Sequence, residues 1–485
     1  MKFFFKTNAN QNIGSGHLQR CLNLARVLKG KNQIYFLLTK TSTSIVKKLR
    51  NEFKIINFKD DKDILKKAKT IFKHKKDSFL IIDDYSINYK WEKIISGFFY
   101  KTLVICDDIS KKHYCNLYLN QNILDIQSNI KIQKKYKENY LVGPKYALLD
   151  KNYSLLLKKK AKKRNKLKNI LISFGGSDKE NLTERVLELL AAKKYNFNVI
   201  VILGNSYQYS FKLKKKFKNF KNITFHKNLK SLAKIYYNTD LSIGAGGISS
   251  WERICFSIPS LVFQVSKNQK FTIDNLKKKK MIIYAGKETN FNKHKFKQQI
   301  LHIKNNFIKI KKQSQDSDIF VDGYGASRVA EILMPSTTAE TSLKKASKSD
   351  VYSYYNWAND KDVRASSFNQ KKILLQDHKK WFYKQLRYPK KNLLYIFKTN
   401  KVYLGQTRLN ISHKTAKIDY SIDRDFRKKG LGSHMLKLVL KKNKSKKLRF
   451  YAEVKKDNVK SINIFKNLKF KSISKKNKII FEKFN

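Results

Sequence analysis

Ile13-Gly14-Ser15-Gly16-His17-Leu18-Gln19-Arg20 is the stretch that decides the fold of the first part of this chain. The apolar run Lys2 to Lys6 before it is typical of a strand, and apolar residues recur after it at helical spacing. The stretch is therefore predicted to be a turn between a strand and a helix. Its glycines let the backbone approach a ligand closely, and His17 falls where the helix begins.

The start of a helix carries free N–H groups and the positive end of the helix dipole. Because such surroundings disfavour imidazolium, we expect His17 to be a neutral base. An ordinary glycine turn with an exposed histidine fits the same residues, so the rest of the chain decides between the two interpretations.

The composition indicates several domains and a basic surface. The 485 residues are too many for one core and suit roughly three domains of about 150 residues. A formal net charge of +70 would ordinarily suggest nucleic acid or anionic membrane as a partner. The lysines, however, are dispersed along the chain. We therefore expect a solvated surface that attracts anionic substrates, and no nucleic-acid partner.

Cysteine usage and hydropathy predict a cytoplasmic protein without a metal and without membrane insertion. No apolar run reaches the roughly 18 residues of a membrane span. No third or fourth ligand accompanies the nearby His and Cys residues at a recognisable spacing, so no metal site is predicted. No C-x-x-C pair is present, and buried thiols in a reducing compartment are expected for Cys21, Cys106, Cys115 and Cys255.

Residues 1–157 alternate between strand and helix patterns, which predicts a doubly wound parallel sheet. Such sheets collect ligands at the carboxyl ends of their strands. His17 follows the first strand, Asp83-Asp84-Tyr85 follows a later one, and Asp107-Asp108 follows the next. Each aspartate could serve only as a helix cap, but several polar strand ends in one lobe favour a cleft.

A second lobe of the same kind is predicted for residues 169–334, after a basic connection at 158–168. Gly175-Gly176-Ser177-Asp178 follows its first strand. Gly244-Ala245-Gly246-Gly247-Ile248-Ser249-Ser250-Trp251-Glu252-Arg253 follows a later one. A glycine-rich turn with serines opening a helix presents N–H groups and hydroxyls to phosphate oxygens, and an early acidic residue can accept from ribose hydroxyls.

Two doubly wound lobes with a hinge, a base in the first lobe and a phosphate turn in the second describe a nucleotide-sugar enzyme of GT-B type. Residues 1–334 resemble the UDP-sugar hydrolases of pseudaminic acid biosynthesis, which remove UDP from UDP-2,4-diacetamido-2,4,6-trideoxy-β-L-altropyranose. The resemblance rests on Ile13 to His17 with Arg20-Cys21, Asp84-Tyr85, Trp91-Glu92, Gly143 to Leu148, Phe174 to Asp178, Ser250 to Arg253, Asn268-Gln269 and Asp322-Gly323.

The resemblance implies metal-free attack of water on the anomeric carbon, with His17 as general base and Tyr85 and Asn268 assisting. UDP and the sugar are expected to bind at Gly14, Gly16, Arg20, Gly175, Gly176, Ser177, Gly246, Gly247, Ser250 and Glu252. One departure concerns the amino-terminal loop, where the family usually has Asp-Ala-Ser and this chain has Asn8-Ala9-Asn10.

A flexible linker is predicted at 335–350, before a third domain at 351–485 of α+β type. Arg427-x-x-Gly430-x-Gly432 opens an apolar-periodic helix there, which is typical of a pyrophosphate turn, although an ordinary turn fits six residues as well. With Asn458 and Ser461 after the next strand, the domain resembles GNAT acetyltransferases. The resemblance implies acetyl-CoA binding by Arg427, Gly430, Gly432 and Asn458.

One branch of those enzymes acetylates the 4-amino group of the same pathway's UDP-sugar, and this domain resembles that branch at Trp357, Asn359, Val363-Arg364, His378 and Trp381-Phe382. Many relatives place a tyrosine general acid where this chain has Phe465. The sugar amine then needs another group to deprotonate it, and Glu453 acting through water is our hypothesis.

These patterns together predict a bifunctional enzyme that acetylates UDP-4-amino-4,6-dideoxy-N-acetyl-β-L-altrosamine and then hydrolyses the product to free sugar and UDP. The alternative is a GT-B glycosyltransferase fused to an acetyltransferase that acts on another amino sugar or a protein amine. Its transferase half would need a sugar or lipid acceptor. A nucleic-acid-binding protein would instead show a focused basic stripe with interleaved aromatic residues.

Overall fold

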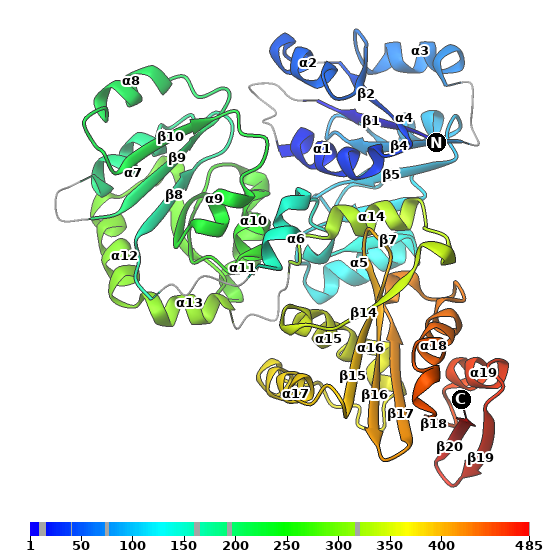
Figure 1. The fold of residues 1–485 in the computed structure, drawn as a ribbon. Helices are drawn as coiled ribbons and strands as arrows, with labels where there is room; N and C mark the ends of the chain where they lie inside the picture. The colour runs from blue at the N-terminus through cyan, green and yellow to red at the C-terminus, as the bar shows by residue number, and fades with distance from the viewer. Residues whose placement is uncertain are drawn as a thin grey trace. The chain divides into compact units, whose positions relative to one another are not determined.

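The computed structural model describes residues 1–8, 16–39, 41–72, 77–159, 165–191, 196–315 and 321–484. The chain divides into two compact units, Met1–Ala326 and Ser327–Asn485, and the first unit contains two sheets (Figure 1). The division falls within α14 (Gly325–Leu333), whereas the sequence predicted that the second lobe extends to residue 334. The predicted fold class, two doubly wound Rossmann-like sheets followed by an α+β domain, is confirmed.

The first lobe is a parallel sheet of seven strands in the order β3-β2-β1-β4-β5-β6-β7. The strand order reverses between β1 and β4, which is where doubly wound sheets bind their ligands. The strands are β1 (Lys2–Thr7), β2 (Gln33–Leu38), β3 (Lys54–Asn57), β4 (Ser78–Asp83), β5 (Lys101–Ile105), β6 (Leu117–Asn120) and β7 (Tyr140–Val142). The helices are α1 (Gly16–Lys29), α2 (Thr43–Arg50), α3 (Asp61–Ile71), α4 (Tyr89–Ser96) and α5 (Ile126–Tyr136).

The second lobe repeats this topology with six parallel strands in the order β10-β9-β8-β11-β12-β13, and its order reverses between β8 and β11. The strands are β8 (Asn169–Ser173), β9 (Asn198–Leu203), β10 (Ile223–Lys227), β11 (Leu241–Ala245), β12 (Ser260–Gln264) and β13 (Ile283–Lys287). The helices are α6 (Lys151–Leu157), α7 (Leu182–Leu190), α8 (Ser210–Lys216), α9 (Ala233–Asn238), α10 (Ser249–Cys255), α11 (Lys270–Lys278), α12 (Lys293–Asn305) and α13 (Phe307–Gln315).

The helix α6 precedes the second sheet in sequence but packs against it. Tyr153 of α6 is buried in the same hydrophobic core as Trp251 of α10. Of the basic connection predicted at 158–168, residues 160–164 lie outside the described residues.

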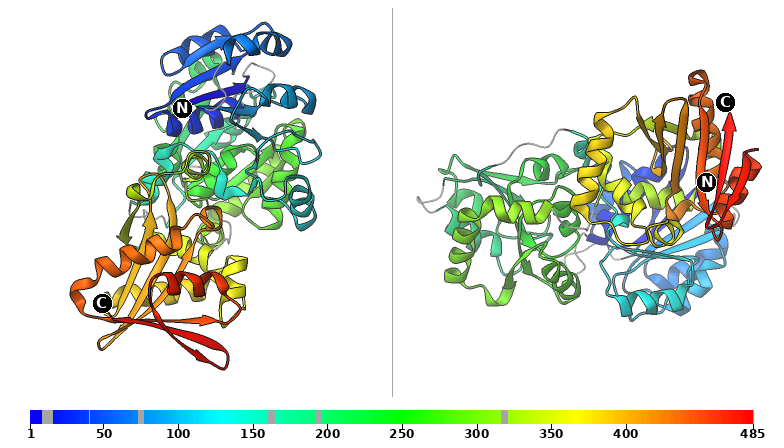
Figure 2. Two further views of the ribbon diagram at one scale, coloured as in Figure 1. Left: turned by 90° about the vertical axis from the view of Figure 1, so that its right-hand side faces the viewer. Right: turned by 90° about the horizontal axis from the view of Figure 1, so that it is seen from below.

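The second unit is built on a sheet in the order β14-β15-β16-β17-β18-β20-β19. Neighbouring strands are antiparallel except β17 and β18. The strands are β14 (Ser342–Lys345), β15 (Asn392–Lys398), β16 (Tyr403–Ser412), β17 (Thr415–Ile422), β18 (Arg449–Lys455), β19 (Lys471–Lys475) and β20 (Lys478–Phe484). Helices α15 (Val351–Ala358) and α17 (Leu375–Arg387) cover one face, α18 (Leu431–Lys442) and α19 (Val459–Asn467) the other, and α16 (Lys361–Ser366) follows α15 (Figures 1 and 2).

The prediction of a flexible linker at 335–350 is wrong in part, because this segment contributes β14 to the sheet. The strand β14 pairs with β15 from Ser342 to Lys345. Its ends are held by local polar contacts, since Thr337 with Glu340 and Ser347 with Asp350 each form a capping box. The Ser, Thr and Lys content that suggested flexibility therefore supplies caps around an edge strand.

Candidate functional sites

His17 lies in the first turn of α1, at the reversal point of the first sheet. Its Nδ1 atom is 2.5 Å from Oδ1 of Asp83, the last residue of β4. A ring that donates its Nδ1 proton to a carboxylate keeps the lone pair on Nε2. Among the described residues, Nε2 has no hydrogen-bonding partner, and 13% of the side chain is exposed. The geometry therefore suits a base whose second nitrogen is held by Asp83.

Arg20, one turn further along α1, is 1% exposed and joins two strand ends. Its Nε and Nη2 atoms donate to the two oxygens of Asp83 at 2.5 and 2.6 Å, and Nη1 donates to Asp107 at 2.7 Å. Burial alone would raise the pKa of Asp83, but the charge of Arg20 and the contact with His17 hold it at about 2. The carboxylate that faces His17 thus stays ionised.

Tyr85 completes the cluster around His17. The two rings meet edge to face, with centroids 4.4 Å apart, and the phenol donates to Asp107 at 2.9 Å. Burial, together with Asp107, raises the pKa of Tyr85 far above its usual value, so the phenol keeps its proton. The structure therefore brings together two of the three residues predicted to act in hydrolysis.

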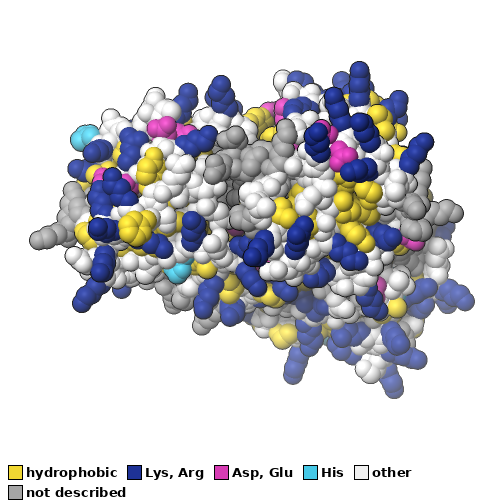
Figure 3. All heavy atoms as spheres, turned by 90° about the horizontal axis from the view of Figure 1, so that it is seen from above, with side chains coloured by type: hydrophobic (Ala, Val, Ile, Leu, Met, Phe, Trp, Pro, Cys, Tyr) yellow, Lys and Arg dark blue, Asp and Glu magenta, His cyan; other side chains and the backbone are white. Residues whose placement is uncertain are grey.

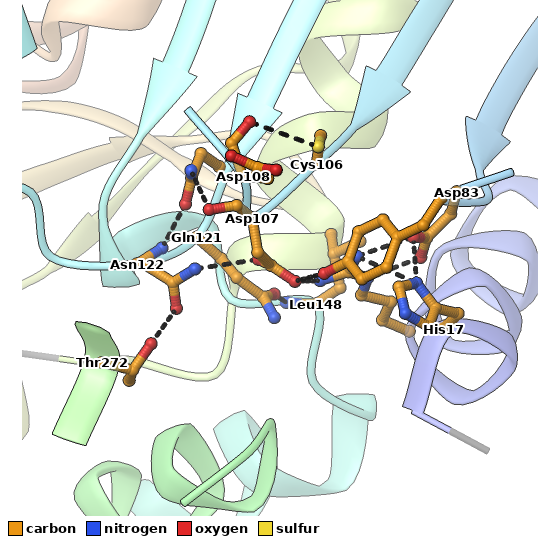
Figure 4. A network of polar contacts seen from close by, with 12 residues as sticks. His17, Asp83, Cys106, Asp107, Asp108, Gln121, Asn122, Leu148 and Thr272 are labelled. Atoms are coloured by element: carbon orange, nitrogen blue, oxygen red, sulfur yellow. Dashed lines mark hydrogen bonds and ion pairs between the residues drawn. The ribbon is translucent and has the colours of Figure 1, made fainter. Parts of the chain in front are cut away.

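A chain of hydrogen bonds leads from this cluster to the second lobe (Figure 4). Asn122 donates to Asp107 at 2.9 Å and accepts a hydrogen bond from Thr272 of α11 at 3.1 Å. Asn275, on the same helix, donates to the carbonyl of Ile123 at 3.1 Å. The position of α11 is thereby linked to the carboxylate that also holds Arg20 and Tyr85.

Asn8, at the departure from the family pattern, is buried and fully engaged. Its amide nitrogen donates to Asp84 at 2.7 Å, and its oxygen accepts from the backbone of Thr39 at 3.0 Å. The buried ammonium of Lys6 also contacts Asp84, at 2.7 Å. An asparagine thus satisfies Asp84 without adding a second carboxylate beside it. Residues 9–15, which include Gly14, lie outside the described residues.

The glycine turn after β11 lies against the start of α1. A Cβ atom at Gly16 would come within 3.1 Å of the side chain of Ile248, and one at Gly246 within 2.5 Å of Ile273 on α11. A Cβ atom at Gly247 would lie 3.6 Å from the side-chain amide nitrogen of Gln269. The phosphate turn predicted in the second lobe and the helix that carries His17 are therefore neighbours.

Asn268 is the predicted catalytic residue that the structure does not bring to His17. It is exposed, and its side chain accepts a hydrogen bond from the hydroxyl of Ser266. It lies next to Gln269, so it borders the glycine turn rather than the base.

Other predicted binding residues of the second lobe have structural contacts. Glu252 accepts a hydrogen bond from Tyr153 at 2.7 Å, and burial raises its pKa. Ser250 is buried and accepts from Arg253. Gly175, Gly176 and Ser177 form the turn after β8, beside the turn after β11, and the carbonyl of Gly176 accepts from the backbone of Ser206. In that turn Gly175 is exposed and Ser177 is half-buried, and both lie at the reversal point of the second sheet.

In the second unit the strands β17 and β18 separate. They pair only from Thr415 to Lys417, opposite Arg449 to Tyr451, and then diverge. Gly430 has a φ of 70° and precedes α18, whose first turn presents free backbone N–H groups. A Cβ at Gly432 would lie 3.0 Å from Ile464, so α18 packs closely against α19.

Two predicted acetyl-CoA residues have intramolecular partners. Arg427 forms ion pairs with Asp360 and Asp362, each at 2.7 Å. The side chain of Asn458 caps α19 by accepting from the backbone of Ser461 at 3.2 Å. Arg427 follows the carboxyl end of β17, and Asn458 follows that of β18.

Glu453, the hypothetical base, has the wrong electrostatic surroundings for that role. Lys417 and Lys478 both donate to its carboxylate, and these contacts lower its pKa. A carboxylate held by two ammonium groups is a poor proton acceptor. Its position on β18, between β17 and β20, explains why the sequence alone did not reveal the pairing.

Tyr420 is a polar group beside the opening that the sequence did not single out. Its hydroxyl is 3.1 Å from that of Ser461, and its ring packs edge-on to Phe465 with centroids 6.0 Å apart. Burial raises the pKa of this phenol to about 12. A protonated hydroxyl therefore lies next to the apolar residue that replaces the usual tyrosine.

A metal cluster requires several ligating side chains close together, and a membrane-spanning helix requires a long apolar stretch. Within the described ranges, no group of three or more His, Cys, Asp or Glu side chains is arranged to hold an ion. The helices described are too short or too polar to cross a bilayer. On the face drawn in Figure 3, Lys and Arg side chains are scattered among polar and hydrophobic ones.

Residues 341–471 match the family model described as an acetyltransferase (GNAT) domain. They form a GNAT acetyltransferase domain. An uncharacterized protein of Methanocaldococcus jannaschii is 29% identical over 99% of both chains. The acetyltransferase domain and the two lobes therefore occur in the same order in that archaeal protein.

Two further relatives match the lobes that precede the acetyltransferase domain. The UDP-2,4-diacetamido-2,4,6-trideoxy-β-L-altropyranose hydrolase of Campylobacter jejuni is 26% identical over 40% of this chain and 67% of its own length. The spore coat polysaccharide biosynthesis protein SpsG of Bacillus subtilis is 24% identical over 53% of this chain and 76% of its own. The N-terminal unit is thus distantly similar to a UDP-sugar hydrolase and to a protein of spore coat polysaccharide biosynthesis.

Sequence reasoning missed the roles of Asp83, Asp107, Asn122 and Thr272. The two aspartates stand at strand ends, which marked them as polar but did not distinguish a cap from a partner of His17. Asn122 and Thr272 are 150 residues apart, and no local pattern links them.

Proposed function

We propose that this chain is a two-site enzyme of amino-sugar nucleotide metabolism. The acetyltransferase domain acetylates the 4-amino group of UDP-4-amino-4,6-dideoxy-N-acetyl-β-L-altrosamine, and the N-terminal unit hydrolyses the diacetamido product to UDP and free sugar. The observation that carries the hydrolase half is the cluster at the reversal point of the first sheet. There His17, held by Asp83, begins a helix that touches the glycine turn of the second lobe.

In this proposal His17 takes a proton from water through Nε2 as the water attacks the anomeric carbon. Asp83 keeps the Nδ1 proton in place and stabilises the charge that forms on the ring. The backbone N–H of Gly246 donates to the carbonyl of Phe263, so in this proposal the N–H of Gly247 stabilises the charge on the departing diphosphate. The similarity to the Campylobacter hydrolase supports this chemistry.

Acetyl-CoA is the acetyl donor that we propose, and it supplies a thioester that an amine can attack. The residues present fit such a ligand, because β17 and β18 leave an opening and α18 begins beside it without a Cβ at Gly430 or Gly432. We assign the proton donor in place of Phe465 to Tyr420, since its phenol stays protonated.

The test follows release of CoA and of UDP from the UDP-4-amino sugar with no sugar acceptor present. The wild type should release both, and UDP release should depend on acetyl-CoA. His17→Ala should lower UDP release by roughly 10²–10⁴-fold and leave CoA release intact. Tyr420→Phe should slow CoA release instead. Exposed His294 and Tyr388 provide the matched controls His294→Ala and Tyr388→Phe.

UDP release that survives His17→Ala would refute the assignment of the base. Release of CoA alone, with UDP appearing only after a sugar or lipid acceptor is added, would favour the glycosyltransferase alternative.

A further inference from the structure

Arg253, on α10, is an arginine buried beneath the glycine turn of the second lobe. Only 1% of the residue is exposed. Its Nη2 atom donates to the carbonyl of Ala245 at 2.5 Å and to the hydroxyl of Ser250 at 3.1 Å. Ala245 ends β11 and Ser250 lies in the first turn of α10, so the guanidinium bridges the two ends of the turn.

The charge of Arg253 is not neutralised by an ion pair. Within the described residues, no carboxylate lies at salt-bridge distance from it, and its Nε atom has no hydrogen-bonding partner. The neighbouring Glu252 acts on it electrostatically, but that carboxylate makes its hydrogen bond with Tyr153. Burial lowers the pKa of Arg253 and raises that of Glu252, so both groups lack the stabilisation that a close pair would give.

A buried guanidinium without a carboxylate partner is costly, and proteins rarely keep one without a use. Its place is specific, because a Cβ at Gly244 would lie 3.4 Å from Nη1. The cation therefore lies directly under the end of β11, and the turn that follows packs against the start of α1 through Ile248 and Gly16. An anion bound on that turn would gain from the charge and would compensate it.

We infer that Arg253 is a positioning residue for a diphosphate, fixing the shape of the glycine turn and supplying the positive charge that selects a phosphorylated ligand. This inference rests on the proposed function for the identity of the nucleoside, but not for the diphosphate. The ligand would be recognised by its phosphates at the turn, with the sugar facing His17.

The test is calorimetric binding of UDP, uridine and inorganic pyrophosphate to the full chain, which needs no turnover. Arg253→Met removes the charge and the hydrogen bonds, and Arg253→Gln keeps a donor for Ala245 without the charge. Both substitutions should lower the affinity for UDP and for pyrophosphate at least tenfold. The affinity for uridine should stay within about twofold of the wild-type value. Arg185→Met, which removes a cation over Phe291 in the same lobe, is the matched control and should leave all three unchanged.

A second readout is thermal unfolding with and without UDP, because a ligand that binds only the folded state raises its stability. UDP should raise the melting temperature of the wild type and of Arg253→Lys, but not that of Arg253→Met. If Arg253→Met does not fold, Arg253→Gln carries the comparison.

Equal weakening of UDP and uridine would show a purely structural role, and unchanged UDP affinity would show none; either result overturns the inference. If the wild type binds pyrophosphate but not UDP, and Arg253→Met loses that binding, the inference stands and the proposed function fails. If the wild type binds neither, both fail.

Discussion

Arg20 and Arg253 are each 1% exposed, and each lies at the reversal point of a doubly wound sheet. The two guanidinium groups differ in the groups that they contact. Arg20 contacts two carboxylates, Asp83 and Asp107. Arg253 contacts only a carbonyl and a hydroxyl. In the first lobe the cation fixes the carboxylate that holds His17. In the second lobe it contacts no carboxylate among the described residues, and under the proposed function the two lobes divide catalysis and anion binding between them.

The largest expected effect is on the first of these arginines. Arg20→Met leaves the buried Asp83 and the half-buried Asp107 without their cation, so the first lobe should lose roughly 3–5 kcal/mol of stability. Urea unfolding followed by hydrogen exchange in peptides from β1 and α1 measures the loss. Arg26→Met breaks a half-exposed pair with Glu52 and should cost less than about 1 kcal/mol. Equal losses in the two variants would contradict the comparison.

Acid should affect the two lobes in opposite directions. The pKa of Asp83 in the folded chain is about 2, below its ordinary 3.8, so its contribution is present above pH 4 and is lost as pH falls towards 2. That loss amounts to roughly 2 kcal/mol. The pKa of Glu252 is raised above 4.5, so the folded second lobe binds a proton more tightly and gains stability as pH falls towards 4.5.

Two variants that each keep one tryptophan, Trp91 in the first lobe or Trp251 in the second, separate these responses in urea unfolding. The Trp251 signal should move to higher urea between pH 7 and 4.5, and the Trp91 signal should move to lower urea below pH 4. Parallel shifts of the two signals would rule out this account of the buried charges.

The smallest effect is expected at Arg427, the arginine predicted to bind a pyrophosphate. Asp360 and Asp362 already pair with Arg427 at the surface. Arg427→Met should therefore lower the affinity for CoA by no more than about fivefold. Arg253→Met should weaken UDP by more than that. Calorimetry with CoA measures the change, and a loss above tenfold would show that Arg427 leaves its carboxylates to bind phosphate.

Much of the fold could be predicted from local sequence. Apolar runs such as Lys2 to Lys6 and Ser78 to Asp83 became buried parallel strands, because a strand covered on both faces has no polar side to alternate. The structure of the segment at 335–350 was harder to predict. Its edge strand has a single apolar residue, the half-buried Leu343, among lysines, and such a sequence resembles that of a linker.

The candidate site was predicted only in part, for a reason of the same kind. His17, Tyr85 and the turn at Gly246 and Gly247 carry local signatures of a strand end or a helix start. Glu453 was misread because its two lysine partners come from other strands and are 36 and 25 residues away.

The sequence alone determined which residues stand at the ends of strands and where glycine permits a close approach, because both depend on periodicity and backbone freedom over a few neighbouring positions. The tertiary structure decided which charges meet. Arg20 finds Asp83 and Asp107 across 63 and 87 residues, while Arg253 finds no acidic partner among the described residues. Strand order and packing set those distances, and an electrostatic interaction depends on distance and burial rather than on separation along the chain.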